Sequence, residues 1–281
     1  MSPSPKSLIL DLLATLKQGS MPVGALVEAG ELFGLAANAI RVAVARLLAS
    51  GEIARDERGR YRLGTTGEAV PRRAGSWKDA DKRVRRWGGG WIAAHAHAGG
   101  RAAQRGRERA VRLLGLRPLV PSLWLRPDNL TAPVDAIRAE LAELGLPGED
   151  LVFSLASLDP AAEERARGLW NVEALCAAHR ALLVKVERSA KRLPRLARGE
   201  AMVESFLLGG QAIRQLVRDP LLPEEICPAG DRQALALALR RYDRLGRIAW
   251  AELLRKFDVP YLRAPLDTRL APSPVELRAE A

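Results

Sequence analysis

Apolar residues near the start of the chain recur at helical spacing in three short segments. Residues 6–18 carry a narrow stripe of large aliphatic side chains, Leu8, Ile9, Leu12, Leu13 and Leu16, which predicts a first helix. A second helix is predicted to begin after Ser20, whose side chain would cap it ahead of Pro22. A third is predicted over residues 36–50, and Gly51 follows it where a glycine commonly ends a helix.

The third predicted helix has two unlike faces on a helical wheel. Its apolar side, expected to face the core, carries four aliphatic residues: Ile40, Val44, Leu47 and Leu48. Its opposite side is small and polar, and it carries Asn38, Val42, Ala45 and Arg46, with Arg41 at the border. A merely solvated helix would more often show Glu and Lys on that side. Because the major groove of DNA admits an α-helix, such a face is suited to enter it.

A basic hairpin is predicted directly after the third helix. Ile53, Tyr61 and Leu63 alternate with arginines around a glycine-containing turn over residues 56–59. Three short helices followed by a basic two-stranded wing are the order of a winged helix-turn-helix domain, which we assign to residues 1–66.

This domain organisation predicts which residues contact DNA. The third helix would read base edges, while the wing and the helix N-termini would hold phosphates. We expect Asn38 and Arg46 to contact bases or phosphates and Arg41 to contact a phosphate, with Val42 and Ala45 on the same face. In the wing, the expected contacts come from Arg58 and Arg60.

The rest of the chain predicts two further domains and a connection. Residues 67–90 form a basic stretch, predicted as a linker helix that ends at three glycines. Residues 91–160 alternate between strands at 91–98, 118–126 and 151–155 and helices at 100–114 and 131–144, which predicts a ferredoxin-like α+β domain. Residues 161–281 read as a helical domain for effector binding and dimerisation. The predicted fold class is therefore α+β and mainly helical.

The positive charge is concentrated in the first part of the chain. Of the formal net charge of +11, residues 1–112 hold +10 and residues 113–281 hold +1. Such asymmetry is typical of a polyanion-binding module joined to a neutral remainder. The basic run at 67–87 fits either a solvated face or additional, non-specific phosphate contacts.

Four segments resemble one known family. Residues 33–64, FGLAANAIRVAVARLLASGEIARDERGRYRLG, resemble the helix-turn-helix and wing of the PaaX family, the bacterial repressors of phenylacetic acid degradation. The resemblance continues in PSLWLRPDNL, in LWNVEAL and, most specifically, in RDPLLPEEICP. The chain departs from the family pattern at Ser122, at Gln211 and at residues 229–231, where Ala-Gly-Asp replaces Trp-Pro-Gly.

The resemblance implies a mode of action. It implies a homodimeric repressor of a catabolic operon that binds a palindromic operator in double-stranded DNA, and the lack of a long apolar run or of a signal-like start leads us to expect it in the cytoplasm. An aryl-acetyl coenzyme A thioester, or a related acyl-CoA, would release it. Because that effector carries several negative charges, its pocket should contain arginines, and Arg180, Arg214 and Arg218 are the candidates.

Enzymatic alternatives find little support in the residues. The middle domain also resembles CRISPR-associated ferredoxin-like endoribonucleases, which need an acidic residue at the end of the first strand, but residues 91–97 contain no Asp or Glu. An acyl-CoA hydrolase finds no GxSxG motif, and Cys176 with His179 lacks an orienting third group. We expect no enzymatic activity. A metal-dependent nuclease and an effector-independent nucleic-acid-binding protein remain the alternatives.

Metal, cofactor and membrane motifs are equally weak. Cys176 and Cys227 stand 51 positions apart with no CxxC, which argues against a disulfide scaffold and a structural zinc. His95 and His97 would share one face of a strand but lack a third ligand, so we expect neither a metal nor a cofactor. No run of 18 apolar residues occurs, so no membrane association is expected.

Overall fold

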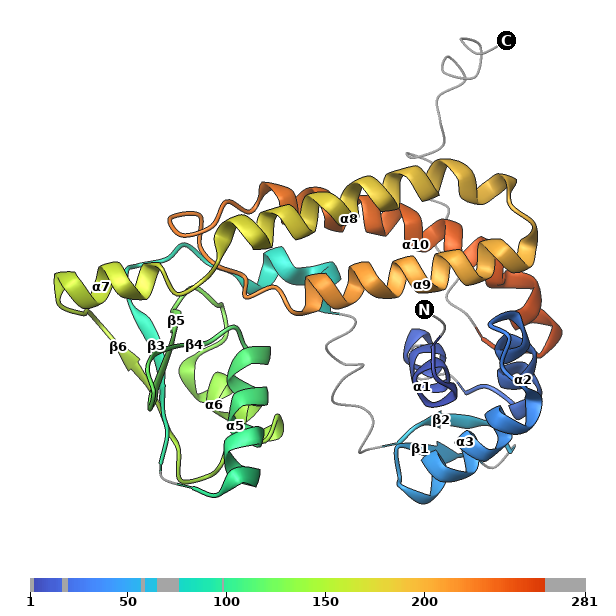
Figure 1. The fold of residues 1–281 in the computed structure, drawn as a ribbon, viewed down its shortest axis with the longest axis horizontal. Helices are drawn as coiled ribbons and strands as arrows, with labels where there is room; N and C mark the ends of the chain where they lie inside the picture. Colours follow the sequence, from blue (N-terminus) through green and yellow to red (C-terminus); the bar gives the residue numbers. More distant parts are fainter. Residues whose placement is uncertain (1–2, 17–19, 57–58, 65–75, 98, 261–281) are drawn as a thin grey trace, which may run out of the picture.

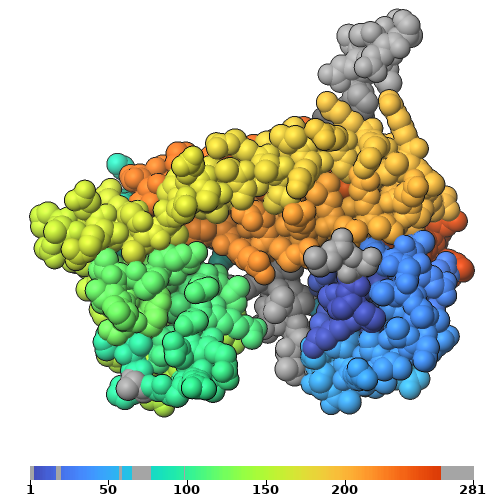
Figure 2. All heavy atoms as spheres, viewed as in Figure 1, coloured from blue at the N-terminus to red at the C-terminus, as the bar shows by residue number. Residues whose placement is uncertain are grey.

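The computed structural model describes residues 3–16, 20–56, 59–64, 76–97 and 99–260. The chain is α+β and mainly helical, with two small sheets. Three long helices lie side by side as a bundle, and two smaller lobes project from one side of it (Figure 1, Figure 2). The N-terminal lobe lies under one end of the bundle and the middle lobe under the other.

The N-terminal lobe consists of α1 (Pro5–Thr15), α2 (Val23–Leu32), α3 (Ala37–Ala49) and an antiparallel hairpin of β1 (Ile53–Arg55) with β2 (Tyr61–Leu63). Gly51 follows α3 with a φ of 70°, which confirms the predicted end of that helix. Two details differ from the prediction. Pro22, instead of Ser20, is the N-cap of α2, and Leu48 is 40% exposed because it lies at the border of the buried face.

The middle lobe is a four-stranded antiparallel sheet with two helices on one face. Along the chain its elements are β3 (Trp91–His95), α5 (Arg101–Leu113), β4 (Arg117–Val120), β5 (Leu123–Pro127), α6 (Val134–Glu143) and β6 (Leu151–Leu155). The strand order is β4-β5-β3-β6. The sequence predicted one strand over residues 118–126, and this was wrong: Pro121 and Ser122 form a turn that splits the segment into β4 and β5, which pair with each other.

The C-terminal part supplies the bundle. Helix α7 (Pro160–Arg167) leads into α8 (Val172–Arg192), and after the short η2 (Leu193–Arg195) come α9 (Arg198–Val217) and α10 (Gly230–Lys256). The interior between the three long helices is apolar and includes Leu182, Val186, Ala212, Leu216, Leu235, Leu239 and Tyr242. None of the helices in the described ranges is long and apolar enough to cross a membrane.

The segment before β3 ties the bundle to the middle lobe. Within the predicted linker helix of 67–90, residues 67–75 lie outside the described residues, and η1 (Ser76–Arg83) forms 3-10 turns instead of an α-helix. Trp77 is 3% exposed in the core of the bundle. Trp87 packs edge-on against Trp91 of β3, with ring centroids 5.3 Å apart. Residues 76–90 are therefore a packed connection, anchored at both ends by tryptophans.

Candidate nucleic-acid interface

Helix α3 presents the predicted polar face to solvent. Ile40, Val44 and Leu47 are between 0% and 4% exposed and face the core of the N-terminal lobe. On the other side, all five residues of α3 that were predicted to contact DNA are exposed: Asn38, Arg41, Val42, Ala45 and Arg46. Among the residues that the structure describes, neither Arg41 nor Arg46 has a hydrogen-bond or ion-pair partner, so both guanidinium groups are available to an anion.

The helices behind α3 fix the orientation of this face. Helices α1 and α2 pack on α3 through an aliphatic core that includes Leu8, Ile9 and Leu26. Gly30 in α2 permits the close approach, because a Cβ at this position would lie 2.7 Å from Cγ1 of Ile40. Since α3 cannot rotate without opening this core, its polar face stays directed outward.

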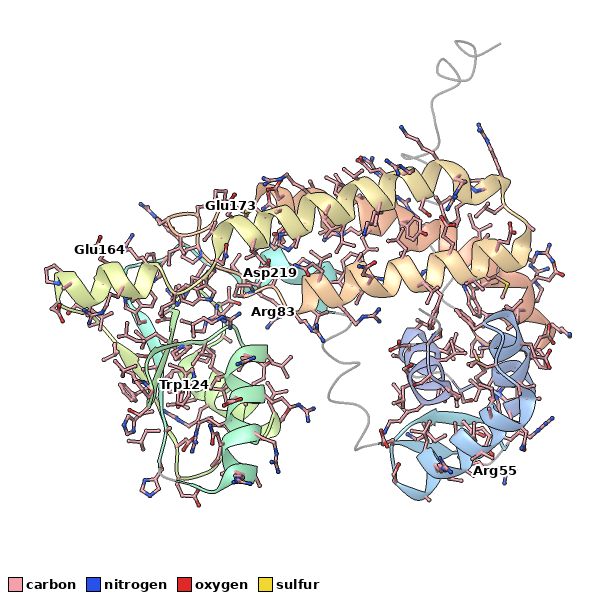
Figure 3. All side chains as sticks on the ribbon, in the orientation of Figure 1. Arg55, Arg83, Trp124, Glu164, Glu173 and Asp219 are labelled. Carbon is pink, nitrogen blue, oxygen red and sulfur yellow. The ribbon has the colours of Figure 1, made fainter. Side chains whose placement is uncertain are left out.

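The wing contributes exposed arginines from both of its strands. Arg55 and Arg62 are exposed, and Figure 3 shows Arg55 at the edge of the lobe. Together with Ser20, Asp56, Arg60, Asp258 and Pro260 they line a surface hollow of about 650 Å³. Arg58, which the sequence also placed at DNA, lies outside the described residues.

Arg60, for which the sequence predicted a contact with DNA, has internal hydrogen-bond partners. Its Nη2 donates to the backbone carbonyl of Asp258 at 2.9 Å and to that of Ser20 at 3.1 Å, and its Nε donates to the Ser20 hydroxyl at 3.2 Å. The side chain therefore ties the wing to the residues after α10. The sequence contained no signal for these contacts, because Asp258 lies 198 positions away.

The N-terminal lobe is docked on the bundle over an apolar contact. Phe33 packs edge-on against Phe206 of α9 with centroids 5.2 Å apart, and Phe206 lies 6.0 Å from Trp250 of α10. Two ion pairs flank this contact, Lys256 with Glu28 at 2.6 Å and Arg214 with Asp11 at 3.7 Å. Burial raises the pKa of Asp11, and Arg214 opposes that shift. These contacts join the N-terminal lobe to α9 and α10.

The three arginines predicted to bind an effector are not brought together. Arg180 pairs with Asp231 at 2.9 Å, and Arg214 pairs with Asp11 of the N-terminal lobe. Arg218, the C-cap of α9, is exposed, and its side chain has no hydrogen-bond or ion-pair partner among the described residues. None of the three lines the wing hollow or the shallow 430 Å³ hollow on α8. The three arginines therefore share neither of these two hollows.

The segment 218–228 forms the joint between the bundle and the middle lobe. Leu221, with a φ of 52°, inserts into the core under α5 and α6. Leu222 and Cys227 pack on the other side of the sheet, beside Trp91 and Trp170. Figure 3 places Asp219 at this joint. The role of the segment in the fold is thus to hold two domains together.

A buried arginine that the sequence did not single out completes this joint. Arg126 at the end of β5 is 2% exposed and donates to the backbone carbonyls of Leu114 and Pro220 at 2.5 and 3.2 Å. Burial lowers the pKa of its guanidinium to about 10. Asn129 donates to the carbonyl of Leu221 at 2.7 Å. The two segments PSLWLRPDNL and RDPLLPEEICP, both singled out by resemblance, therefore contact each other.

A second buried polar group lies next to this joint. Nε2 of His179 is 3.2 Å from a carboxylate oxygen of Asp219, and Nη1 of Arg232 is 3.5 Å from the other. That second oxygen also accepts from the backbone N–H of Leu221 at 2.8 Å. These contacts fix the turn after α9, since an unpaired buried carboxylate would be costly.

The two histidines that the sequence offered as metal ligands find no third ligand among the described residues. In the described parts of the chain, no three His, Cys, Asp or Glu side chains are grouped to hold a metal. Asp150 lies near His97 but is paired with Arg107, both being less than 10% exposed. Burial alone would raise the pKa of Asp150, but hydrogen bonds from Arg107 and from the His97 N–H outweigh it and lower the pKa.

The two cysteines lie close together although they are far apart in sequence. Cys176 and Cys227 are both free thiols, with sulfurs 3.9 Å apart. Burial, with Cys176 adding to it, raises the pKa of Cys227 to about 12. This shift favours the neutral thiol form of Cys227.

Comparison with known proteins identifies the N-terminal lobe. Residues 4–67 match the family described as PaaX-like protein, which confirms the resemblance seen in residues 33–64. No curated protein matches the chain. Among solved structures, the chain is similar to the uncharacterized protein Rv0674 from Mycobacterium tuberculosis, with a TM-score of 0.55 and 23% sequence identity over 86% of this chain and 98% of that chain. At this identity the likeness shows a shared fold.

Proposed function

We propose that this chain, whose residues 4–67 match the PaaX-like family, is a transcription regulator that binds duplex DNA through the exposed face of α3. The observation that carries the proposal is the outward face of α3, where two arginines without internal partners stand beside small side chains. The wing arginines Arg55 and Arg62 extend this surface for phosphate contacts. Catalysis has no part in the proposal.

Substitutions on α3 test this proposal. Fluorescence anisotropy would measure binding to the DNA upstream of the chain's own gene and to a random duplex. Arg46→Ala is expected to weaken binding to the specific DNA by about 1–3 kcal/mol, and Asn38→Ala is expected to reduce discrimination between the two duplexes. Arg188→Ala, on the bundle helix α8, serves as the control. If the parent protein does not prefer the upstream DNA, the regulator proposal fails for that locus.

The finer proposal is a homodimeric repressor of a catabolic operon on a palindromic operator. It rests on the resemblance of residues 33–64 and 218–228 to the PaaX family. Two copies related by a two-fold axis would place two α3 helices in half-sites about 34 Å apart, one turn of DNA. Analytical ultracentrifugation with and without DNA measures the stoichiometry, and one chain per operator would contradict the proposal.

An acyl-CoA effector is the second part of the finer proposal. In one arrangement of the bundle the two α3 helices would not both fit the operator. An effector that binds this arrangement more tightly than the DNA-bound arrangement would release the protein, and the difference between these two affinities would be sufficient. Arg214 suits this coupling, because an anion that binds its guanidinium competes with Asp11 of the N-terminal lobe.

A thioester panel tests this part of the proposal. Phenylacetyl-CoA and related thioesters, with free coenzyme A as the control, are titrated into the DNA complex and followed by anisotropy. Release by one thioester, weakened in Arg214→Gln but not in Arg188→Gln, supports the proposal. Tight binding that none of the thioesters reverses favours an effector-independent DNA-binding protein instead.

A further inference from the structure

Helix α5 in the middle lobe carries a line of exposed arginines. Arg101, Arg105, Arg109 and Arg112 follow one another at intervals of four, four and three residues, so they share one side of the helix. All four are exposed. Among the described residues, none of these guanidinium groups has an ion-pair or hydrogen-bond partner. We refer to these four residues as the α5 arginine strip.

The opposite side of α5 holds the strip in a fixed orientation. Ala110 and Val111 are fully buried against the sheet. Arg107, on the same buried side, donates to both carboxylate oxygens of Asp150 and to the His97 carbonyl. Its charge is thus neutralised within the lobe, whereas the charges of the strip are not. Because α5 is anchored at this pair and in the core, the strip points outward as a rigid unit.

The strip concentrates positive charge that its own helix compensates only at Glu108, whose carboxylate accepts from Gln104. Residues 101–112 contain five arginines and one glutamate, and because Arg107 is paired with Asp150, the four strip arginines and Glu108 leave a net charge of +3. Like charges four positions apart destabilise a helix. The pKa of Arg117 is lowered mostly by burial, and the positive charge of Arg112 lowers it further. An arrangement that costs stability in the isolated chain fits a surface whose counter-charge comes from a partner.

We propose that the α5 arginine strip is a second DNA-contact surface, which binds duplex phosphates beside the segment read by α3. The inference rests on the proposed function of α3 and extends the footprint of each chain to the middle lobe. These contacts are to the phosphate backbone and therefore independent of base sequence.

The geometry of the strip fits a duplex. From Arg101 to Arg112 the helix rises about 16 Å at 1.5 Å per residue. Over that length a duplex presents roughly ten phosphate charges, since they occur every 1.7 Å or so along its axis. Guanidinium groups bind phosphate oxygens in bidentate fashion. The middle and N-terminal lobes project from the same side of the bundle (Figure 2), so one duplex held at α3 can run on toward the middle lobe.

The test removes three charges from the strip and three from elsewhere. The triple variant Arg105→Gln, Arg109→Gln and Arg112→Gln is compared with a matched control set, Arg188→Gln and Lys191→Gln on α8 with Arg195→Gln on the adjoining η2, which we call the α8 control. Both sets are exposed, and both lower the net charge by three. Since none of the three α5 arginines has an internal partner, the strip variant is expected to melt no lower than the parent, which thermal unfolding checks.

Binding is measured by anisotropy as a function of salt on two lengths of the upstream DNA. One duplex spans about one helical turn around the α3 site and the other about 40 base pairs. For the strip variant on the long duplex we expect at least a tenfold loss of affinity and a salt slope lowered by up to about 2.7, or 0.9 per lost phosphate contact. On the short duplex the strip variant should equal the control.

The outcomes separate the two proposals. If the full chain binds the long duplex but the strip variant and the α8 control behave alike on it, the strip is not a DNA surface, and the proposal for α3 stands. If the full chain prefers the upstream DNA on neither length, both proposals fall together. An equal loss on the short and long duplexes contradicts a flanking contact, because it means that the strip acts only through overall charge.

Discussion

Arg60 offers the sharpest separation between a structural and a DNA-contacting role in the wing. Its guanidinium makes four hydrogen bonds of 2.9 to 3.4 Å, to the carbonyls of Asp258, Ser20 and Phe257 and to the Ser20 hydroxyl. Arg60→Ala removes all of them and frees the residues after α10 from the wing. The variant should therefore lose folding stability.

The size of the loss follows from the bonds removed. Each hydrogen bond in a protein contributes about 0.5–1.5 kcal/mol net. Because Arg60 is only half-buried, water replaces part of what is lost, so we expect a total of about 1–3 kcal/mol. The salt slope for DNA should change by much less than the roughly 0.9 that one phosphate contact contributes.

Arg62→Ala is the matched control, since Arg62 is exposed on the same hairpin and lines the same hollow. It should change stability by no more than about 0.5 kcal/mol but lower the salt slope by about 0.9. Urea unfolding gives the stability of both variants, and anisotropy at several salt concentrations gives the slopes. If Arg60→Ala unfolds like the parent and lowers the slope by one unit, the internal role argued for Arg60 is refuted.

Two further predictions concern the joint and the buried ion pair of the middle lobe. Gly115 has a φ of 79°, and a Cβ there would lie 2.8 Å from Cα of Pro220. Gly34 has a similar φ of 72° but nothing within 4 Å of such a Cβ, so Gly34→Ala should lower the free energy of unfolding by about 1–2 kcal/mol through backbone strain alone. Gly115→Ala should lower it by more, because the clash adds to the strain. Urea unfolding of both variants isolates the clash, and equal losses would contradict it. Asp150 has a lowered pKa, so the stability from its pair with Arg107 is present above the unfolded pKa of about 3.9 and is lost as pH falls through the folded pKa. The stability difference between the parent and Asp150→Asn should be largest near neutral pH and shrink below about pH 4; a difference independent of pH would show that the pair is not the cause.

Local patterns predicted the N-terminal lobe better than the rest. The three helices and the hairpin follow from short-range spacing, and the exposed side of α3 agrees with the wheel except at Leu48, which the wheel placed on the buried side. The turn within residues 118–126 was missed because Pro121 and Ser122 interrupt two apolar strands without a glycine to mark the break. Hydrophobic periodicity predicts a single strand in such a case.

The contacts between domains could not be predicted from the sequence, for a different reason. In the sequence, nothing distinguishes Arg126 from the other arginines of this arginine-rich chain. Its burial depends on the carbonyl of Pro220, which lies 94 positions away. Arg60 is bonded to Asp258 across a similar gap in sequence. Spacing along a chain reports helix and strand faces, but it carries no information about which distant backbone carbonyls will accept a hydrogen bond.

The most direct measurement of the central claim is photo-crosslinking from the face of α3. A photoreactive amino acid replaces Val42, which is 41% exposed on α3, or Val184, which is 54% exposed on α8 beside the basic residues of the α8 hollow. Each protein is bound to the upstream duplex and irradiated, and the covalent complex is quantified. We predict a strong crosslink to DNA from position 42 and little from position 184. Equal crosslinking from both positions, or none from position 42 in a protein that is bound to DNA, would contradict recognition through α3.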